Sequence, residues 1–496
     1  MTYWKKQEVE QMRKKCGLLI LGMLIAGLFV MVKIYKSSTK IITLSWAVFD
    51  SPYDYSVAEQ ALNKNLEKKN YPYEIKFMNF SMDYEKTYAE NFDAYMEFIK
   101  QENIDLVNCP GIWGAYDVYA MMIQNKMLEP LDYCINKTDI GKALYESYPE
   151  KLWETMKDGG KIYGVLTPYT NLNYYAVIKA EYGQKYGIGK EELSIQTLKK
   201  ILLKAQKEEE AAGNEAFIAG VSLPYYHFAA NYEYTVCNFV EVSTDENIKA
   251  VNILQEPMYE NWLKDINQIY LAGALADEKD YWEKLENGEF LMVGGYSYSS
   301  EAAVEAIRAA YGIPEECELY AVEMPELKNP LNGSGMKNAV SANSGNKEKA
   351  AEVLAAIYSD SELSNAIVYG EEGVSYTNKD GFAIYTDDYA ETGMFLQEAF
   401  GNPFLVYPGQ NDIADKQQRL WEAMENAELS KLAGFHFDME QIGETIQKLN
   451  TISMKNQLLY GKTKDLQTDL EKAREEADKA GIESIVEEMN RQLSDW

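Results

Sequence analysis

Histidines, nucleophiles and acidic residues are the side chains of this 496-residue chain that could perform catalysis or bind a metal. Only two histidines occur, His227 and His436, which is too few for most histidine-based metal sites and for a catalytic triad. No G-x-S-x-G pattern marks a hydrolase nucleophile. The 78 acidic residues guarantee accidental carboxylate pairs, so such pairs carry no evidence for a glycosidase. We therefore predict that the chain is not an enzyme.

Two further patterns approach known ligand-binding loops without completing them. Gly461-Lys-Thr463 resembles the end of a phosphate-binding loop, but Asn456 stands where that loop requires glycine. The segment from Tyr376 to Asp387 has the spacing of a calcium loop, yet Tyr376 replaces the first aspartate, which favours a turn at Gly381. We expect neither a cofactor nor a metal.

Aromatic residues offer a different chemistry, because the chain contains 38 Tyr and 8 Trp. Tyrosine combines a flat apolar face with a hydroxyl group and so suits the surface of a sugar, although a tyrosine-rich core remains the alternative. Candidate ligand-binding residues are those at strand ends or in glycine-marked loops: Trp46, Asp50, Trp113, Tyr169, Tyr296 and Tyr298.

The elements that must position these residues alternate between strand and helix. Strands are predicted at 41–49, Tyr73–Phe80 and Ile104–Cys109, which indicates an α/β lobe with a largely parallel sheet. Ligands of such sheets bind at the carboxyl ends of strands, where Asp50 and the loop Pro110–Trp113 fall. Two helices separate the strands and are marked by apolar stripes: Val57, Ala61, Leu62 and Leu66, then Phe92, Tyr95, Met96 and Ile99.

A strand–helix unit also occupies residues 335–360. Ala339-Val340 reads as the end of a buried strand, and the following helix buries Ala350, Val353, Leu354 and Ile357 at i, i+3, i+4 and i+7 spacing. Further helices are predicted at Ile195–Glu210 and Asn261–Ala272, and a loop at Gly294-Gly295-Tyr296.

Several motifs together resemble family 1 extracellular solute-binding proteins, the ligand-capturing subunits of bacterial ABC importers. The segment Gly335–Asp360 is similar to a strand and helix of that family, Gly160–Val165 to its "GKIYGVP" strand, and Gly288–Ser297 to its "GKxAMxxGGW" segment. The ending Gly481–Trp496 looks like the C-terminal domain of unknown function found in the LipO-like branch. The four matches occur in the family's order.

The resemblance implies a class II, two-lobed, periplasmic-binding-protein-like α/β fold with an N-terminal transmembrane helix and a C-terminal helical extension. Lobe 1 is expected to be discontinuous and the chain to cross between lobes near Gly164–Thr170 and Leu319–Pro325. The expected divisions are 1–40 for the cytoplasmic stub, anchor and linker, 41–168 plus 321–400 for lobe 1, 169–320 for lobe 2, and 401–496 for a mostly helical C-terminal domain.

The N-terminus carries an unbroken apolar run, Cys16–Val32, that spans about 25 Å as a helix. More basic residues precede the run than follow it, which predicts a cytoplasmic N-terminus and an extracellular ectodomain in a single-pass membrane protein. A cleaved signal peptide is the alternative, but Lys33, Tyr35 and Lys36 occupy the region where a cleavage site needs small residues.

The charge of the chain indicates which ligands it disfavours, and its cysteines indicate whether it contains disulfides. Residues 41–496 carry 76 acidic and 40 basic side chains, and such a surface repels nucleic acids and polyanions. Cys109 and Cys134 could pair, but without a C-x-x-C arrangement we favour reduced, buried thiols at Cys109, Cys134, Cys237 and Cys317.

The resemblance implies a membrane-tethered receptor that captures a carbohydrate, most simply an oligosaccharide, and presents it to ABC permease subunits. Two alternatives remain open at this point. One is a sensor that reports ligand occupancy to a membrane histidine kinase, and the other is a receptor for peptides.

Overall fold

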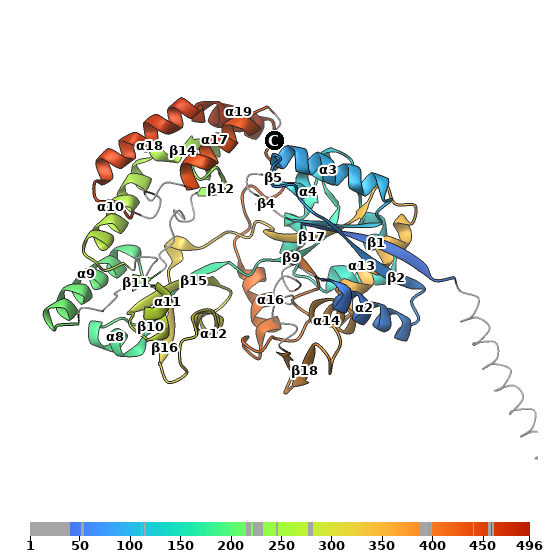
Figure 1. Ribbon diagram of the computed structural model, residues 1–496, viewed down its shortest axis with the longest axis horizontal. Helices are drawn as coiled ribbons and strands as arrows, with labels where there is room; N and C mark the ends of the chain where they lie inside the picture. Colours follow the sequence, from blue (N-terminus) through green and yellow to red (C-terminus); the bar gives the residue numbers. More distant parts are fainter. Residues whose placement is uncertain are drawn as a thin grey trace, which may run out of the picture.

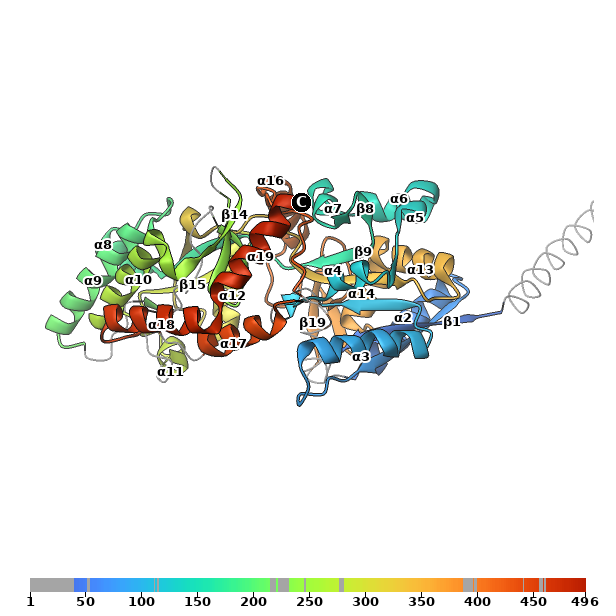
Figure 2. The ribbon, with the colours of Figure 1, turned by 90° about the horizontal axis from the view of Figure 1, so that it is seen from above.

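The computed structural model describes two lobes that lie side by side and meet at the centre of the molecule (Figure 1, Figure 2). We call the lobe that begins with β1 lobe 1 and the other lobe 2. In the described part of the chain no helix is long and apolar enough to cross a bilayer, and the anchor predicted at Cys16–Val32 lies outside that part. The described residues are 40–496, with gaps at 51–53, 111, 114–115, 215–219, 222–231, 245–246, 276–280, 387–395, 397–398, 440, 455–457 and 459–460.

Lobe 1 is built on a mixed sheet. β1 runs parallel to β2 and β3, whereas β17 runs antiparallel to β3, β6 and β9. The predicted parallel arrangement is therefore confirmed for the first three strands only, because the strand that returns from lobe 2 enters in the opposite direction. The strand order is β2 (Tyr73–Phe80), β1 (Ile42–Phe49), β3 (Leu106–Cys109), β17 (Gly335–Ser341) and β6 (Leu128–Glu129), and β9 (Gly164–Pro168) also pairs with β17.

Helices cover both faces of this sheet, which explains the almost continuous apolar sequence of β1. Because side chains alternate along a strand, Trp46 faces the core under α2, α13 and α14, and its neighbour Ala47 faces the core under α3 and α4. The helices of lobe 1 are α2 (Ser56–Lys68), α3 (Tyr88–Gln101), α4 (Val118–Gln124), α5 (Asp132–Lys137), α6 (Asp139–Glu146), α7 (Glu150–Thr155), α13 (Lys347–Ser359), α14 (Ser361–Tyr369) and α16 (Lys416–Asn426).

Most of the predicted elements of lobe 1 are confirmed. The helix α13 buries all four residues of its predicted stripe, and the turn predicted at Gly381 joins β18 (Tyr376–Lys379) to β19 (Phe382–Tyr385). Asp380 and Gly381 both have positive φ, as the tight turn of a two-residue hairpin requires. The prediction that Val57 is buried is wrong. Its side chain is 47 % exposed, because it lies at the first turn of α2.

Lobe 2 contains a four-stranded sheet with a core on each face. Tyr174, Ala176 and Ile178 of β10 face the core that α9 and α10 share, and Val177 faces α12. The predicted Gly294–Tyr296 loop is wrong, since these residues lie inside β15 and pair with β10. The sheet order is β11 (Gly220–Val221), β15 (Met292–Ser297), β10 (Asn173–Lys179) and β16 (Leu319–Glu323).

The remaining elements of lobe 2 are a small antiparallel sheet and its helices. The predicted helices at Ile195–Glu210 and Asn261–Ala272 are confirmed as α9 and α10. The bounds are β12 (Tyr232–Val236), β13 (Val240–Ser243), β14 (Lys249–Asn252), α8 (Ala180–Tyr186), α9 (Ile195–Ala211), η2 (Ile253–Gln255), α10 (Pro257–Leu271), α11 (Tyr281–Glu286), α12 (Ser300–Tyr311) and η3 (Pro325–Leu327).

The last three helices pack on lobe 2 and share its core. These are α17 (Gly443–Met454), α18 (Leu466–Ala480) and α19 (Ile482–Asp495), and their apolar residues join those of α10 and β13. Arg474 donates to the Leu254 carbonyl at 2.7 Å and to Glu260 at 3.0 Å. Asn490 both accepts from and donates to the backbone of Ala250 on β14, so polar contacts fix the orientation of these helices.

Three chain segments, at 168–173, 324–335 and 427–439, cross between the lobes, and we call them the hinge ribbon. The segments are hydrogen-bonded to one another: Asn329 donates its N–H to the Leu172 carbonyl, and Leu331 bonds with the backbone of Glu428 and Ser430. The third segment leads from Ala427 in the core of lobe 1 to Leu432 in the core of lobe 2. The sequence analysis did not foresee this third crossing.

Candidate functional site

The carboxyl ends of β1 and β2 form an edge of the lobe 1 sheet, and Asp50 lies directly after β1. Its carboxylate accepts hydrogen bonds from the N–H of Met82 at 2.9 Å and from the hydroxyl of Tyr84 at 2.6 Å. Asp50 has a φ of 46°, a turn conformation that aspartate tolerates better than most residues. Asp50 therefore fixes the loop after β2, whose Tyr84 is 80 % exposed.

The end of the next strand, β3, carries a short hairpin. Its strands are β4 (Ile112–Trp113) and β5 (Tyr116–Asp117), with Trp113 opposite Tyr116. The predicted Pro110–Trp113 loop thus includes a strand, and the side chain of Trp113 lies outside the described residues. Asp117 ends β5 and caps α4 by accepting the N–H of Ala120 at 3.0 Å.

Asp117 also links lobe 1 to the third segment of the hinge ribbon. The Nδ1 of His436 lies 3.3 Å from Oδ2 of Asp117, and its Nε2 lies 3.8 Å from Oδ2 of Asp158. Burial acts to raise the pKa of Asp117, but His436 and the ammonium of Lys337 outweigh it and lower that pKa to about 2. The charged carboxylate thus ties this segment to lobe 1.

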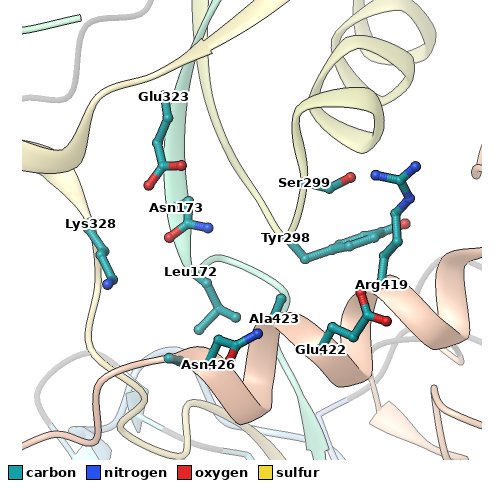
Figure 3. Close-up of a pocket in the computed structure, with 11 residues that line it drawn as sticks. Leu172, Asn173, Tyr298, Ser299, Glu323, Lys328, Arg419, Glu422, Ala423 and Asn426 are labelled. Carbon is teal, nitrogen blue, oxygen red and sulfur yellow. The ribbon is translucent and has the colours of Figure 1, made fainter. Parts of the chain in front are cut away.

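A pocket of about 310 Å³ lies where lobe 2 meets α16 (Figure 3). Burial raises the pKa of the Tyr298 hydroxyl, and the ring extends toward Arg419. Arg419 forms an ion pair with Glu301 of α12 at 2.9 Å and so connects α16 to lobe 2. Other lining residues are Leu172, Asn173, Ser299, Glu323, Lys328 and Glu422.

A larger cavity, of about 910 Å³, lies between α3 and α4 of lobe 1 and the segment that leads into α17. One wall consists of α3 and α4, including Phe92, Met96 and Gln124. The other wall consists of described residues from 437–439 and 441–447, including Phe437 and Gln441. Both lobes therefore contribute walls to this cavity.

The structure does not bring the predicted binding residues to one place. Trp46 is completely buried between Phe77 and Phe400, with ring centroids 5.6 and 5.2 Å away, because the alternation of β1 directs it into the core. Tyr296 is half-buried and packs edge-on against Tyr174 at 5.0 Å. Tyr169 is 39 % exposed and lines a small cavity of about 200 Å³ at the hinge ribbon.

The four described cysteines are free thiols, and three of them are buried. Burial raises the pKa of Cys237 to about 12 and that of Cys109 further, which leaves both thiols protonated and unreactive at neutral pH. The expectation of reduced, buried thiols is confirmed for Cys109, Cys134 and Cys237, whereas Cys317 is partly exposed.

The sequence of this chain is similar to those of known proteins in two respects. Residues 431–496 match the model of DUF3502, a domain of unknown function. A carbohydrate ABC transporter substrate-binding protein of Streptococcus pneumoniae serotype 4 (strain ATCC BAA-334 / TIGR4) is 25% identical over 386 residues, which are 72% of this chain and 74% of the relative.

Solved structures extend the match to nearly the whole chain. The N-glycan transport solute-binding protein NgtS of Streptococcus pneumoniae superposes with a TM-score of 0.64 at 19% identity, over 91% of this chain and 98% of that one. The chain has the solute-binding-protein fold and ends in a DUF3502 domain. An HMO-binding, ABC-transporter-associated solute-binding protein of Bifidobacterium longum infantis ATCC 15697 shares the fold with a TM-score of 0.57 at 14% identity, over 91% of this chain and 98% of that one. The resemblance inferred from the sequence motifs is confirmed.

Sequence reasoning missed two features of the candidate site. Tyr84 was overlooked because it lies four residues beyond the end of the predicted strand Tyr73–Phe80, and no glycine or proline marks its loop. Residues 437–447 were overlooked because their role depends on the third crossing, which brings them opposite α3. A weak signal did exist: the apolar Phe435, Phe437 and Met439 alternate in a segment without regular structure.

Proposed function

We propose that the chain is an extracellular receptor that captures an oligosaccharide between its two lobes and delivers it to the permease subunits of an ABC importer. The observation that supports this most is the pair of lobes joined by a hydrogen-bonded hinge ribbon, in a chain whose fold is similar to that of NgtS. NgtS has been solved in complex with Man1GlcNAc and with Man5GlcNAc. We infer that this chain likewise binds its ligand rather than converting it.

The binding residues we propose lie at the carboxyl ends of β1 and β3 and along the hinge ribbon. Asp50 and Trp113 occupy the strand ends, and Tyr169 and Tyr298 flank the crossings. Tyr84 joins them because Asp50 holds its hydroxyl while its ring is exposed. Trp46 is left out, since its ring would have to leave the core to touch a ligand.

Tethering by Cys16–Val32 is part of the same proposal. It places residues 41–496 outside the cell within reach of a permease in the same membrane. The strongly acidic composition of this part keeps it soluble and disfavours anionic ligands, which supports a neutral sugar.

A binding screen tests the proposed function. The purified chain is melted in the presence of neutral oligosaccharides, anionic oligosaccharides and short peptides. A correct ligand stabilises the fold by about 2.7 kcal/mol at a hundredfold excess over its dissociation constant. Stabilisation by neutral sugars alone is the expected result, and stabilisation by peptides alone would replace the proposal with a peptide receptor.

A further inference from the structure

The DUF3502 domain has no assigned role, yet its first residues form a wall of the 910 Å³ cavity. This volume lies at the upper end of the range of about 300–1,000 Å³ that is usual for small-molecule sites. The wall is held in place from behind: the Gln492 side chain of α19 accepts the N–H of Asp438 and donates to its carbonyl, both at 2.8 Å. The domain thus presents a fixed surface toward lobe 1.

The chemistry of the lining favours a neutral, hydroxyl-rich ligand. Among its described residues are three carboxylates, Asp93, Asp438 and Glu444, and no lysine or arginine, so an anionic ligand would be repelled. Carboxylates accept hydrogen bonds from sugar hydroxyls, and amides both accept and donate them. Apolar surface lies between the polar groups, at Phe92, Met96, Met121, Phe437 and Met439.

Several of the amides are available for a ligand. Within the described part of the chain no side-chain hydrogen bond engages Gln124, Gln441 or Gln447. Gln124 lies on α4, and the other two lie on the facing wall. A ligand in the cavity can therefore form hydrogen bonds with glutamine side chains of both walls without breaking a hydrogen bond between described residues.

The cavity also adjoins the proposed ligand site. Thr87 lines it and is only three residues from Tyr84, which Asp50 holds at the sheet edge. On the other side, α4 begins directly after Asp117 and ends at the lining residue Gln124, and His436, which lies beside Asp117, directly precedes the lining residue Phe437. Because α3 and α4 both begin near residues of the proposed ligand site and both line the cavity, a chain-like ligand that extends along either helix would reach it.

We propose that this cavity is an outer compartment for the distal sugar residues of a long neutral oligosaccharide, and that the DUF3502 domain supplies its wall. This inference rests on the proposed function, since it extends the same site. Because the compartment spans two lobes, a glycan long enough to fill it stabilises their closed arrangement more than a short one does.

The test compares short and long ligands in a wild-type chain and a Gln441→Ala/Gln447→Ala variant. The full chain, purified in detergent, is titrated calorimetrically with neutral manno-, malto- and cello-oligosaccharides of two to six residues and with Man5GlcNAc. Loss of two neutral hydrogen bonds weakens binding of the long ligands by about tenfold and leaves the disaccharides unchanged. Gln467→Ala, an exposed glutamine of the same domain, is the matched control and should bind every ligand as the wild type does.

The possible results distinguish failure of the outer compartment from failure of the proposed receptor function. Equal losses for short and long ligands, or no loss for either, contradict the outer compartment while the receptor function stands. Wild-type affinity that does not rise with ligand length contradicts it as well. If the wild type binds no oligosaccharide, the proposed function fails and the outer compartment fails with it.

Discussion

Replacing Asp117 with asparagine tests how the third segment of the hinge ribbon is held to lobe 1. The amide oxygen of asparagine can still accept the N–H of Ala120, so the cap of α4 is kept. What is lost is the negative charge that faces His436 and Lys337. The variant therefore isolates the electrostatic contribution from the capping contribution.

The magnitude follows from the lowered pKa. The pKa of Asp117 falls from its ordinary 3.8 to about 2, and its side chain is only 16% exposed, so solvent screens the effect little. A shift of this size corresponds to about 2.5 kcal/mol of folding free energy at neutral pH. A lowered carboxylate pKa stabilises the folded state above the unfolded pKa, and the stabilisation is lost as pH falls through the folded pKa. About half of it remains at pH 3.

Urea unfolding at pH 7, 5, 4 and 3 measures this dependence. Asp117→Asn should unfold more easily than the wild type by about 2.5 kcal/mol at pH 7, and the difference should shrink to about half at pH 3. Asp139→Asn is the control, because the Asp139 side chain is fully exposed. A difference that stays constant down to pH 3, or one below about 0.5 kcal/mol at pH 7, refutes the electrostatic role of Asp117.

Three further substitutions probe the hinge, the site and the C-terminal helices. Glu301→Gln removes the ion pair with Arg419 that connects α12 of lobe 2 to α16 of lobe 1; the lobes should then move relative to each other more easily and ligand affinity rise about two- to fivefold in calorimetric titration, and weaker binding would contradict this. Trp113→Ala should weaken ligand binding by about 2 kcal/mol without lowering the melting temperature, and unchanged affinity would remove Trp113 from the site. Arg474→Ala should lower the free energy of unfolding by about 1.5–3 kcal/mol in urea, since two hydrogen bonds to lobe 2 are lost; equal stability would mean that the C-terminal helices are held by apolar packing alone.

Local patterns predicted the elements of lobe 1 well. The helix α13 was expected because its apolar residues recur at helical spacing, and the structure buries Ala350, Val353, Leu354 and Ile357 completely. A turn at Gly381 was expected from its glycine, and the structure forms it as the tight turn of a hairpin, with positive φ at Asp380 and Gly381. In these cases a few neighbouring residues determine the conformation.

Features that depend on distant contacts could not be predicted in this way. Trp46 stands near a strand end, but its exposure depends on Phe400, which is more than 350 residues away in the chain and covers the ring. The Gly294–Tyr296 segment reads as a loop by its glycines, yet pairing of each of its residues with β10 makes it a strand. The large cavity likewise arises only where the C-terminal domain meets α3.

Ligand-induced closure tests the central claim most directly. The radius of gyration of residues 41–496 is measured by small-angle scattering with and without the oligosaccharide that binds best. Capture between two lobes predicts a smaller radius in the complex, with unchanged helix content by circular dichroism. An unchanged radius at saturating ligand would contradict capture by closure of the lobes.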